Sequence, residues 1–335
     1  DANNCAAYAV EQDYATGLPN FDTGNQYADM AFKNATSIGF RCGFSAGCAE
    51  TSMLRDSFTG NLAGAWIGNQ NALDMWFWYC LFQNNSYGVS NSNPVTGSGS
   101  FHVFNSVFIN SRVSDISYSN VQAGTFRNNY SIGAGAGGGT SNPSGHFIWA
   151  GGSEGKDVAV IQGNVVLDWT PGSASFPQAI FEQNAGPIVV IDNVFRNAVS
   201  NATAPVVSNG LSIGSLFSMG NTYTVSTVGA CGGAVTILAA GLCHSVDDQV
   251  LARSAVNPTQ PALPGTPPNN GRAIFEVAPG ASAATVQAAI NSAVAAGSRS
   301  VVHLQAGAYT WGTTLTVPAN SDIQIIGDGF NTRAG

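Results

Sequence analysis

The chain is poor in charge, above all in positive charge. Only 9% of its 335 residues are charged, lysine occurs only as Lys33 and Lys156, and the formal net charge is −8. Such a composition offers no basic surface for a phosphate backbone, so nucleic acid is not an expected partner. Apolar runs such as Gly233–Gly241 are shorter than the roughly 20 residues that a membrane-spanning helix needs, so no membrane partner is expected either.

The six cysteines show no CxxC spacing, and the four histidines are scattered, so neither a metal nor another cofactor is expected. Two cysteine pairs are close in sequence and flanked by glycine: Cys42 with Cys48, and Cys231 with Cys243. We expect both pairs to form disulfides, which favours an oxidising, extracellular location. The alternative is six reduced cysteines buried as small hydrophobic residues, Cys80 among them.

A short phrase recurs along the chain: two or three apolar residues, a small polar residue, one further position, then an aromatic or β-branched residue. The last residue of the phrase falls at Phe58, Phe82, Phe108, Tyr130, Val166, Phe195 and Tyr223. These positions are 22 to 36 residues apart. Variable spacing around a fixed phrase is typical of a solenoid with loop insertions. The aromatic positions are therefore predicted to stack inside the solenoid.

A polar residue stands two positions before each of these landmarks: Asp56, Cys80, Ser106, Asn128, Asn164, Asn193 and Asn221. Asparagine suits a tight corner, and stacked amides can hydrogen-bond between successive coils. We predict an all-β fold, a right-handed parallel β-helix of eight or so coils with an internal asparagine ladder. The one strong helical period, over Ala283–Ala296, predicts a single short capping helix that Gly297 ends.

Residues 273–329 contain a strand, this helix, and then the segments VVHLQAGAY and LTVPANSDIQIIGDG. The segment resembles the opening of proteins in the pectate-lyase-like superfamily, whose tandem members include β-helix glucanases and tail-spike-like depolymerases. The resemblance implies a β-helix that associates with carbohydrate, and it places a β-helix head last in this chain.

The expected organisation is a β-helix body and tail at 1–250, a Pro-rich linker at 251–271, and a head segment at 272–335. The head would either cap the N-terminal end of a body, in its own chain or a neighbour's, or begin a second β-helix. β-Helices could thus associate through 272–335.

The strand before each phrase defines a second row of positions. We expect Ile67, Val89, Ile116, Ile148, Phe181 and Val207 to point inward. Alternation along a strand then turns Trp66, Asp115, Trp149 and Glu182 outward. Carboxyls beside outward indoles predict a sugar-binding groove, with Trp149 and Trp66 binding substrate. The tryptophan-rich strand Leu73–Tyr79, which includes Asp74, is expected to be buried because of its apolar density.

The predicted function is degradation of an extracellular polysaccharide, with Glu182 as acid and Asp115 as base of a hydrolase. A lyase is less favoured because no acidic cluster on adjacent turns would bind calcium. The two carboxyls could instead be solvated surface residues. The alternative function is a non-catalytic adhesive or surface-structural β-helix.

Overall fold

A computed structural model describes the chain in segments, which are residues 2–3, 8–12, 22–43, 48–68, 73–91, 99–118, 121–136, 145–150, 158–172, 178–182, 187–198, 206–209, 215–224, 235–237, 243–263, 272–297, 299–305 and 307–327. The chain forms two compact units, Asp1–Pro267 and Pro268–Gly335. The boundary falls inside the Pro-rich stretch that the sequence predicts as a linker.

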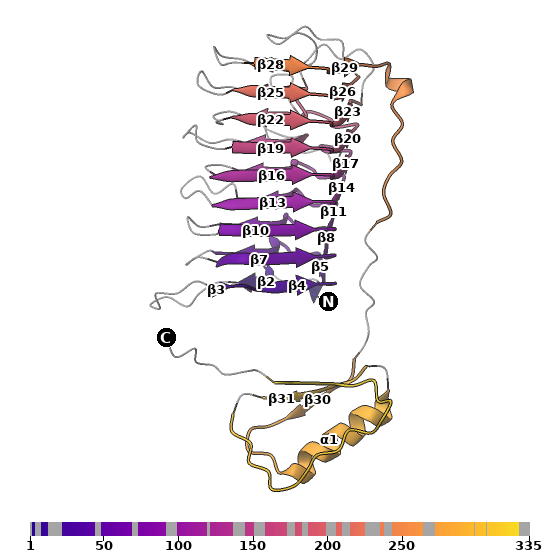
Figure 1. Ribbon diagram of the computed structural model, residues 1–335. Coiled ribbons are helices and arrows are strands. Elements are labelled where there is room, and N and C mark those ends of the chain that lie inside the picture. The colour runs from indigo at the N-terminus through magenta and orange to yellow at the C-terminus, as the bar shows by residue number, and fades with distance from the viewer. Residues whose placement is uncertain are drawn as a thin grey trace. The chain divides into compact units, whose positions relative to one another are not determined.

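The first unit is a parallel β-helix, as predicted, and its coils pass in turn through three parallel sheets (Figure 1). Sheet C contains β3 (Asp22–Thr23), β4 (Gln26–Ala28), β7 (Cys48–Leu54), β10 (Leu73–Trp78), β13 (Ser100–Phe104), β16 (Ala123–Arg127), β19 (Val158–Gln162), β22 (Ile188–Ile191), β25 (Leu216–Met219) and β28 (Cys243–Val246).

The other two sheets follow sheet C in each coil. Sheet A contains β1 (Ala2–Asn3), β5 (Ala31–Lys33), β8 (Ser57–Thr59), β11 (Leu81–Gln83), β14 (Val107–Ile109), β17 (Tyr130–Ile132), β20 (Val165–Leu167), β23 (Val194–Arg196), β26 (Thr222–Tyr223) and β29 (Gln249–Val250). Sheet B contains β2 (Tyr8–Gln12), β6 (Ile38–Cys42), β9 (Ala63–Ile67), β12 (Tyr87–Ser90), β15 (Ser114–Tyr118), β18 (His146–Ala150), β21 (Ile180–Glu182), β24 (Val207–Asn209) and β27 (Val235–Ile237).

Aromatic rings from successive coils stack inside the helix, where the middle residues of sheet A point inward. Phe32, Phe58, Phe82 and Phe108 follow one another with ring centroids 4.8 Å apart. The landmark in the next coil is wrong by one residue, because Ser131 and not Tyr130 pairs with Phe108. Tyr130 instead packs with Leu81, Val107 and Leu167 in a separate cluster.

The corner between sheets C and A carries the predicted asparagine ladder. The side-chain amide of each asparagine donates to the next carboxamide oxygen at 2.9–3.0 Å, through Asn129, Asn164, Asn193 and Asn221. The prediction of Asn128 as the fourth member is wrong by one residue, because Asn129 occupies the ladder. Asn128 is exposed, and its φ is 55°. Cys80 is buried in this ladder, as predicted; it is a free thiol, and burial raises its pKa.

The disulfide between Cys42 and Cys48 is confirmed, with Cα atoms 5.8 Å apart. Cys243 is also disulfide-bonded. Its predicted partner, Cys231, lies outside the described residues, so that pairing stays a prediction.

The start of the predicted linker is not a free tether, because residues 251–257 are bonded to the β-helix. The carboxylate of Asp168 accepts from Arg196 at 2.5 Å and from Arg253, in the 3₁₀ helix η1 (Arg253–Ala255), at 2.8 Å. Arg253 also donates to the Asn197 carbonyl, and Arg196 donates to the Val256 carbonyl. The segment thus turns back from the last coil toward the coil of β20 (Figure 1).

Replacing Arg253 by alanine is expected to release residues 251–257 while costing at most about 1 kcal/mol, because a partly exposed ion pair contributes little to stability. Limited proteolysis should cleave the variant near η1 faster than the parent chain, with nearly unchanged thermal unfolding. Arg272→Ala is the control, because the hydrogen bond of this arginine to Gln324 lies within the second unit. Equal cleavage rates for R253A and the parent chain would contradict the assignment.

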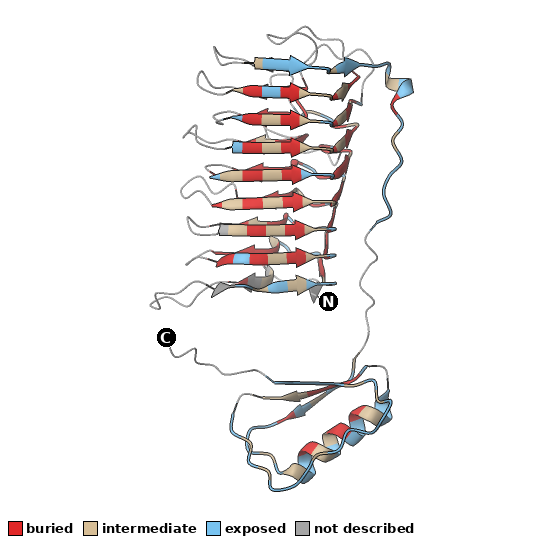
Figure 2. Ribbon diagram, in the orientation of Figure 1, coloured by how far each residue is buried: buried red, intermediate tan, exposed pale blue. Residues whose placement is uncertain are grey.

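The second unit packs one helix on a small parallel sheet. It consists of β30 (Ile274–Val277), α1 (Ala283–Ala296), β31 (Val301–Leu304) and β32 (Gln324–Gly327), in the sheet order β30-β31-β32. The helix spans the predicted residues and buries Val286, Ile290 and Ala293. All of β32 is exposed (Figure 2). The role of 272–335 as a cap or as the start of a second β-helix stays a prediction.

Candidate functional site

Trp66 and Trp149, predicted to face outward from sheet B, lie in one row of that sheet with Ser90, Ser117 and Phe181. The guanidinium of Arg41 lies 5.4 Å from the Trp66 ring. Trp149 stacks on Phe181 at 4.5 Å, and its ring lies 5.0 Å from that of His146. Both tryptophans are half-buried.

Asp115 does not face outward, and that part of the prediction is wrong. Its carboxylate accepts a hydrogen bond from Ser131, which occupies the interior row of sheet A, and only 1% of the residue is exposed. Position 115 follows the corner directly. Gly88 holds the same position in the previous coil, and a Cβ built on it would lie 2.7 Å from the Phe108 ring. A side chain at this position therefore points into the interior. Burial raises the pKa of Asp115 to about 7.

Glu182 also points inward, contrary to the prediction. Ile180, and not Phe181, pairs with Ile148 and Val207, so the expected inward row was displaced by one residue in this strand. Glu182 instead aligns with Ala150, next to Tyr118, and the Tyr118 hydroxyl donates to its carboxylate. The carboxyl is fully buried.

The outer face of sheet B is largely covered. Arg41, Ser90, Ser117 and Phe181 are each 4% exposed or less. His146 is buried too; its Nδ1 donates to the Gln178 carbonyl at 2.6 Å, and burial lowers its pKa to about 4. The structure therefore brings the two predicted indoles to the outside but encloses the two carboxyls, and it forms no open acid–base pair from them.

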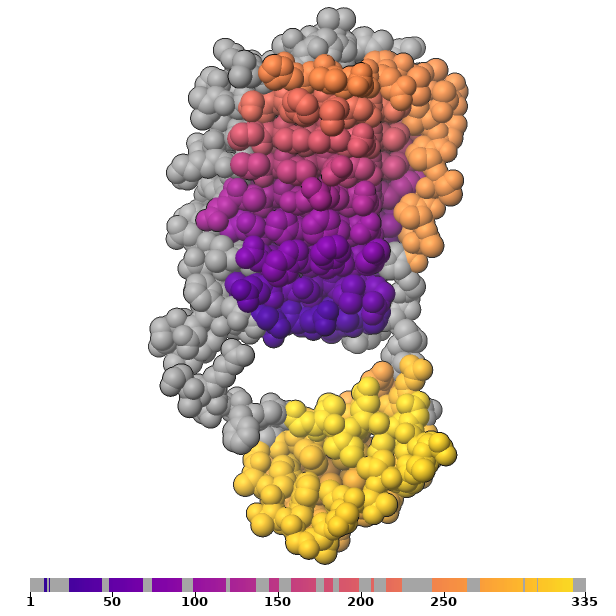
Figure 3. Space-filling view, viewed as in Figure 1, coloured from indigo at the N-terminus to yellow at the C-terminus, as the bar shows by residue number. Residues whose placement is uncertain are grey.

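A second set of aromatic side chains lies on the outer face of sheet C, and two of them belong to the strand Leu73–Tyr79, which the sequence analysis expected to be buried. We call Trp76, Trp78, His102 and Phe104 the aromatic strip. Alternation in β10 and β13 turns these four outward, while Met75, Phe77, Phe101 and Val103 between them are fully buried. Figure 3 shows this face, with its strands toward the viewer, as a flat surface that no other described segment of the unit covers.

The four rings are nearly parallel. Trp78 and Phe104 lie 4.3 Å apart at 26°, and Trp76 and His102 lie 6.2 Å apart at 20°. His102 and Phe104, in one strand, differ by 13°. The rings therefore stack along the axis of the β-helix. Burial lowers the pKa of His102 and so favours the neutral imidazole, although the charge of Asp74 opposes that shift.

Trp76 is half-buried, and its neighbour in the preceding strand is small. In the preceding coil Trp76 is paired with Ser52, whose side chain is too small to cover an indole. The carboxylates of Glu50 and Asp74 precede this pair in β7 and β10. Both residues have positive φ, 50° and 53°, inside a strand. Such local departures from strand geometry re-aim side chains and are frequent beside functional sites.

The aromatic strip thus offers one flat apolar surface with carboxylate hydrogen-bond acceptors beside it, and Tyr79 at its end is 51% exposed. Among the described residues no group of three or more histidine, cysteine or acidic side chains could hold a metal ion. No helix in the described part of the chain is long and apolar enough to cross a membrane.

Comparison with known proteins found no matching family model, no matching curated protein and no matching solved structure.

Proposed function

We propose that the protein binds a neutral extracellular polysaccharide on the outer face of sheet C. The observation that carries the proposal is the aromatic strip, in which four rings from two adjacent coils lie on an open sheet face. A contiguous group of aromatic side chains on an uncovered sheet face is typical of a binding surface. Sugar rings present apolar C–H faces that stack on indoles, and their hydroxyls donate to carboxylates.

The charge around the strip favours a neutral glycan. Glu50 and Asp74 lie beside it, and the chain carries a net charge of −8. The guanidinium of Arg55, at the same edge, is already paired with Asp29 at 2.6 Å. A polyuronate would meet like charge at Glu50 and Asp74, while the exposed Arg127, paired with Phe104 on the following strand, is a positive charge on the same face. The Cys42–Cys48 disulfide supports the extracellular part of the proposal.

Binding without cleavage is the form of the proposal that the geometry supports best. The predicted hydrolysis by Glu182 and Asp115 gains no support, because a general acid and base must reach the substrate and both carboxyls are enclosed. The adhesive alternative needs only an accessible face. Activity on a glycan panel, with Glu182→Gln as control, still tests hydrolysis directly.

Trp76→Ala is expected to weaken binding of a neutral glucan about tenfold, since an aromatic contact contributes roughly 0.5–1.5 kcal/mol beyond its buried area. Affinity electrophoresis or calorimetry with a neutral β-glucan, a xylan and polygalacturonate would measure it. Trp78→Ala should act in the same direction.

The matched controls are Trp66→Ala and Trp149→Ala, which remove outward indoles from the covered face of sheet B. They should leave the affinity unchanged. If W149A lost binding and W76A did not, the binding site would lie on sheet B. If the parent chain bound no neutral glycan, the proposal would be overturned.

A further inference from the structure

The sequence contains four Asn-x-Ser/Thr motifs, which are the acceptor signal for N-linked glycans. They begin at Asn34, Asn84, Asn129 and Asn201. A glycan can be retained only where the asparagine amide faces solvent in the folded protein. The structure describes three of these asparagines, Asn34, Asn84 and Asn129, and they differ in exposure; Asn201 lies outside the described residues.

Asn129 has no room for a glycan. It is 1% exposed, and its amide nitrogen donates to the Val103 carbonyl at 2.9 Å and to the Asn164 carboxamide oxygen at 3.0 Å. Glycosylation would replace one of these two amide hydrogens and disrupt the ladder. The motif at Asn129 is therefore structural.

Asn84 has the opposite environment. It is exposed in the corner between β11 and β12, with a φ of 56°. Its backbone N–H donates to the Ile109 carbonyl at 2.9 Å, which fixes the turn. The side-chain amide has no hydrogen-bond partner among the described residues. Ser86, which supplies the motif's hydroxyl, is half-buried and bonds through its backbone N–H to the Asn61 carbonyl.

Asn34 occupies the same corner position two coils earlier, because Lys33, Thr59 and Gln83 are paired in register. It is exposed and has a φ of 54°. Two coils correspond to about 10 Å along the helix, at 4.8 Å per paired strand.

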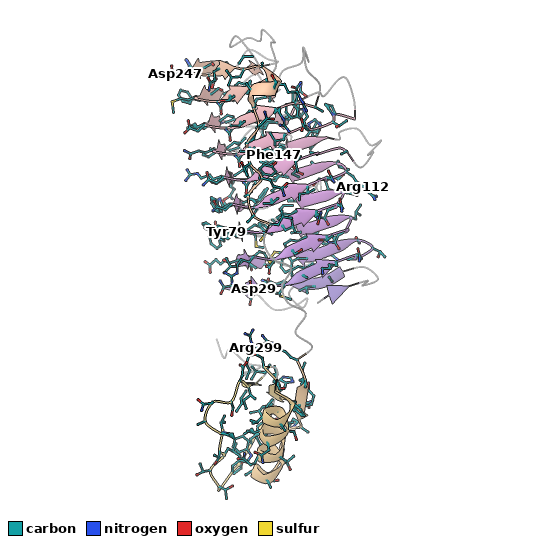
Figure 4. The ribbon with its side chains drawn as sticks, turned by 90° about the vertical axis from the view of Figure 1, so that its right-hand side faces the viewer. Asp29, Tyr79, Arg112, Phe147, Asp247 and Arg299 are labelled. Atoms are coloured by element: carbon teal, nitrogen blue, oxygen red, sulfur yellow. A yellow bond between two sulfur atoms is a disulfide. The ribbon has the colours of Figure 1, made fainter. Side chains whose placement is uncertain are left out.

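This corner joins sheets A and B, so it lies away from sheet C. Figure 4 looks at the side of the unit and shows the two corners of sheet A on opposite sides: Arg112 marks the corner with sheet B, and Tyr79 marks the corner with sheet C. A glycan on Asn84 would therefore leave the aromatic strip uncovered.

We infer that Asn84 is an N-glycan acceptor and that Asn34 is a second one; the inference rests on the extracellular location in the proposed function. The reaction forms a bond between the Asn84 amide nitrogen and the anomeric carbon of an oligosaccharide carried on a polyprenyl diphosphate. The bond from that carbon to the diphosphate breaks, the diphosphate leaves, and the amide nitrogen loses one proton. No oxidation or reduction occurs.

The test is to pass the full chain through the secretory pathway of a eukaryotic cell and to map its peptides. Treatment with a peptide-N-glycosidase in ¹⁸O water converts a glycosylated asparagine to labelled aspartate. We expect label at Asn84 and Asn34 and none at Asn129, in both secreted and cell-retained protein. Ser86→Ala should abolish the label at Asn84, and Ser86→Thr should retain it.

An unlabelled Asn84, or a labelled Asn129 in folded protein, would overturn the inference. Glycan binding is measured separately, with enzymatically deglycosylated protein. If W76A bound glycans as well as the parent chain, the binding proposal would fail, but the labelling result at Asn84 would still stand. Likewise, an unlabelled Asn84 would not affect the binding measurement.

Discussion

Replacing Asn193 by alanine is expected to destabilise the β-helix by about 4 kcal/mol, measured as the free energy of unfolding in urea. Asn193 is 1% exposed. Its amide nitrogen donates to the Ile161 carbonyl at 3.0 Å and to Asn221 at 2.9 Å, and its oxygen accepts from the backbone and side-chain nitrogens of Asn164. Alanine would leave several buried polar groups without partners, each costing about 1–3 kcal/mol.

The matched control is Asn128→Gly. Asn128 stands directly before a ladder residue but is exposed, and glycine accepts its positive φ. This variant should change the free energy of unfolding by less than about 1 kcal/mol. Similar losses in N193A and N128G would show that corner conformation, and not the buried amide chain, stabilises the coils.

The coils and the ladder could be predicted from the sequence because each depends on a repeated local pattern. The error at Asp115 arises because that position directly follows a corner, whereas the two errors of alignment share another cause. A pair of similar neighbours, Asn128 with Asn129 and Ile180 with Phe181, offers two equivalent alignments of the phrase. A shift of one residue in a strand moves its side chains to the opposite face. The choice between the alignments is made by packing with the coils above and below, which the phrase does not contain.

The candidate site was harder to predict than the fold. Strands of parallel sheets are apolar on both faces when both faces are covered, so the composition of Leu73–Tyr79 fits burial as well as exposure. Trp76 and Trp78 are outward because of the register of β10 with β7, and they are accessible because no other described segment crosses sheet C. Aspartate is several-fold enriched at positive φ, but nothing in the sequence of Leu73–Tyr79 predicts that Asp74 adopts it inside a strand.

Asp115→Asn is expected to make the protein more stable at pH 8, on the order of 4 kcal/mol, and to change its stability little at pH 4. The Asp115 carboxyl has an ordinary pKa of 3.8 in the unfolded chain and about 7 in the folded protein, chiefly because burial disfavours its charge. Between these values the folded state binds more protons than the unfolded state. The free energy of unfolding therefore falls as pH rises from about 4 to 7 and stays low above that.

Asparagine can hydrogen-bond to Ser131 without carrying a charge, so the variant should lack this pH dependence. Urea denaturation of both proteins at pH 4, 6 and 8 would measure the difference. Burial also raises the pKa of Asp56 and lowers that of His146, but both groups are present in each protein, so their contributions cancel in the comparison. Asp192→Asn, at an exposed carboxyl, should shift stability by less than about 0.5 kcal/mol at every pH. If the stability difference between D115N and the parent chain were independent of pH, Asp115 would have the same pKa in the folded and unfolded states. That result would contradict the raised pKa of the buried carboxyl.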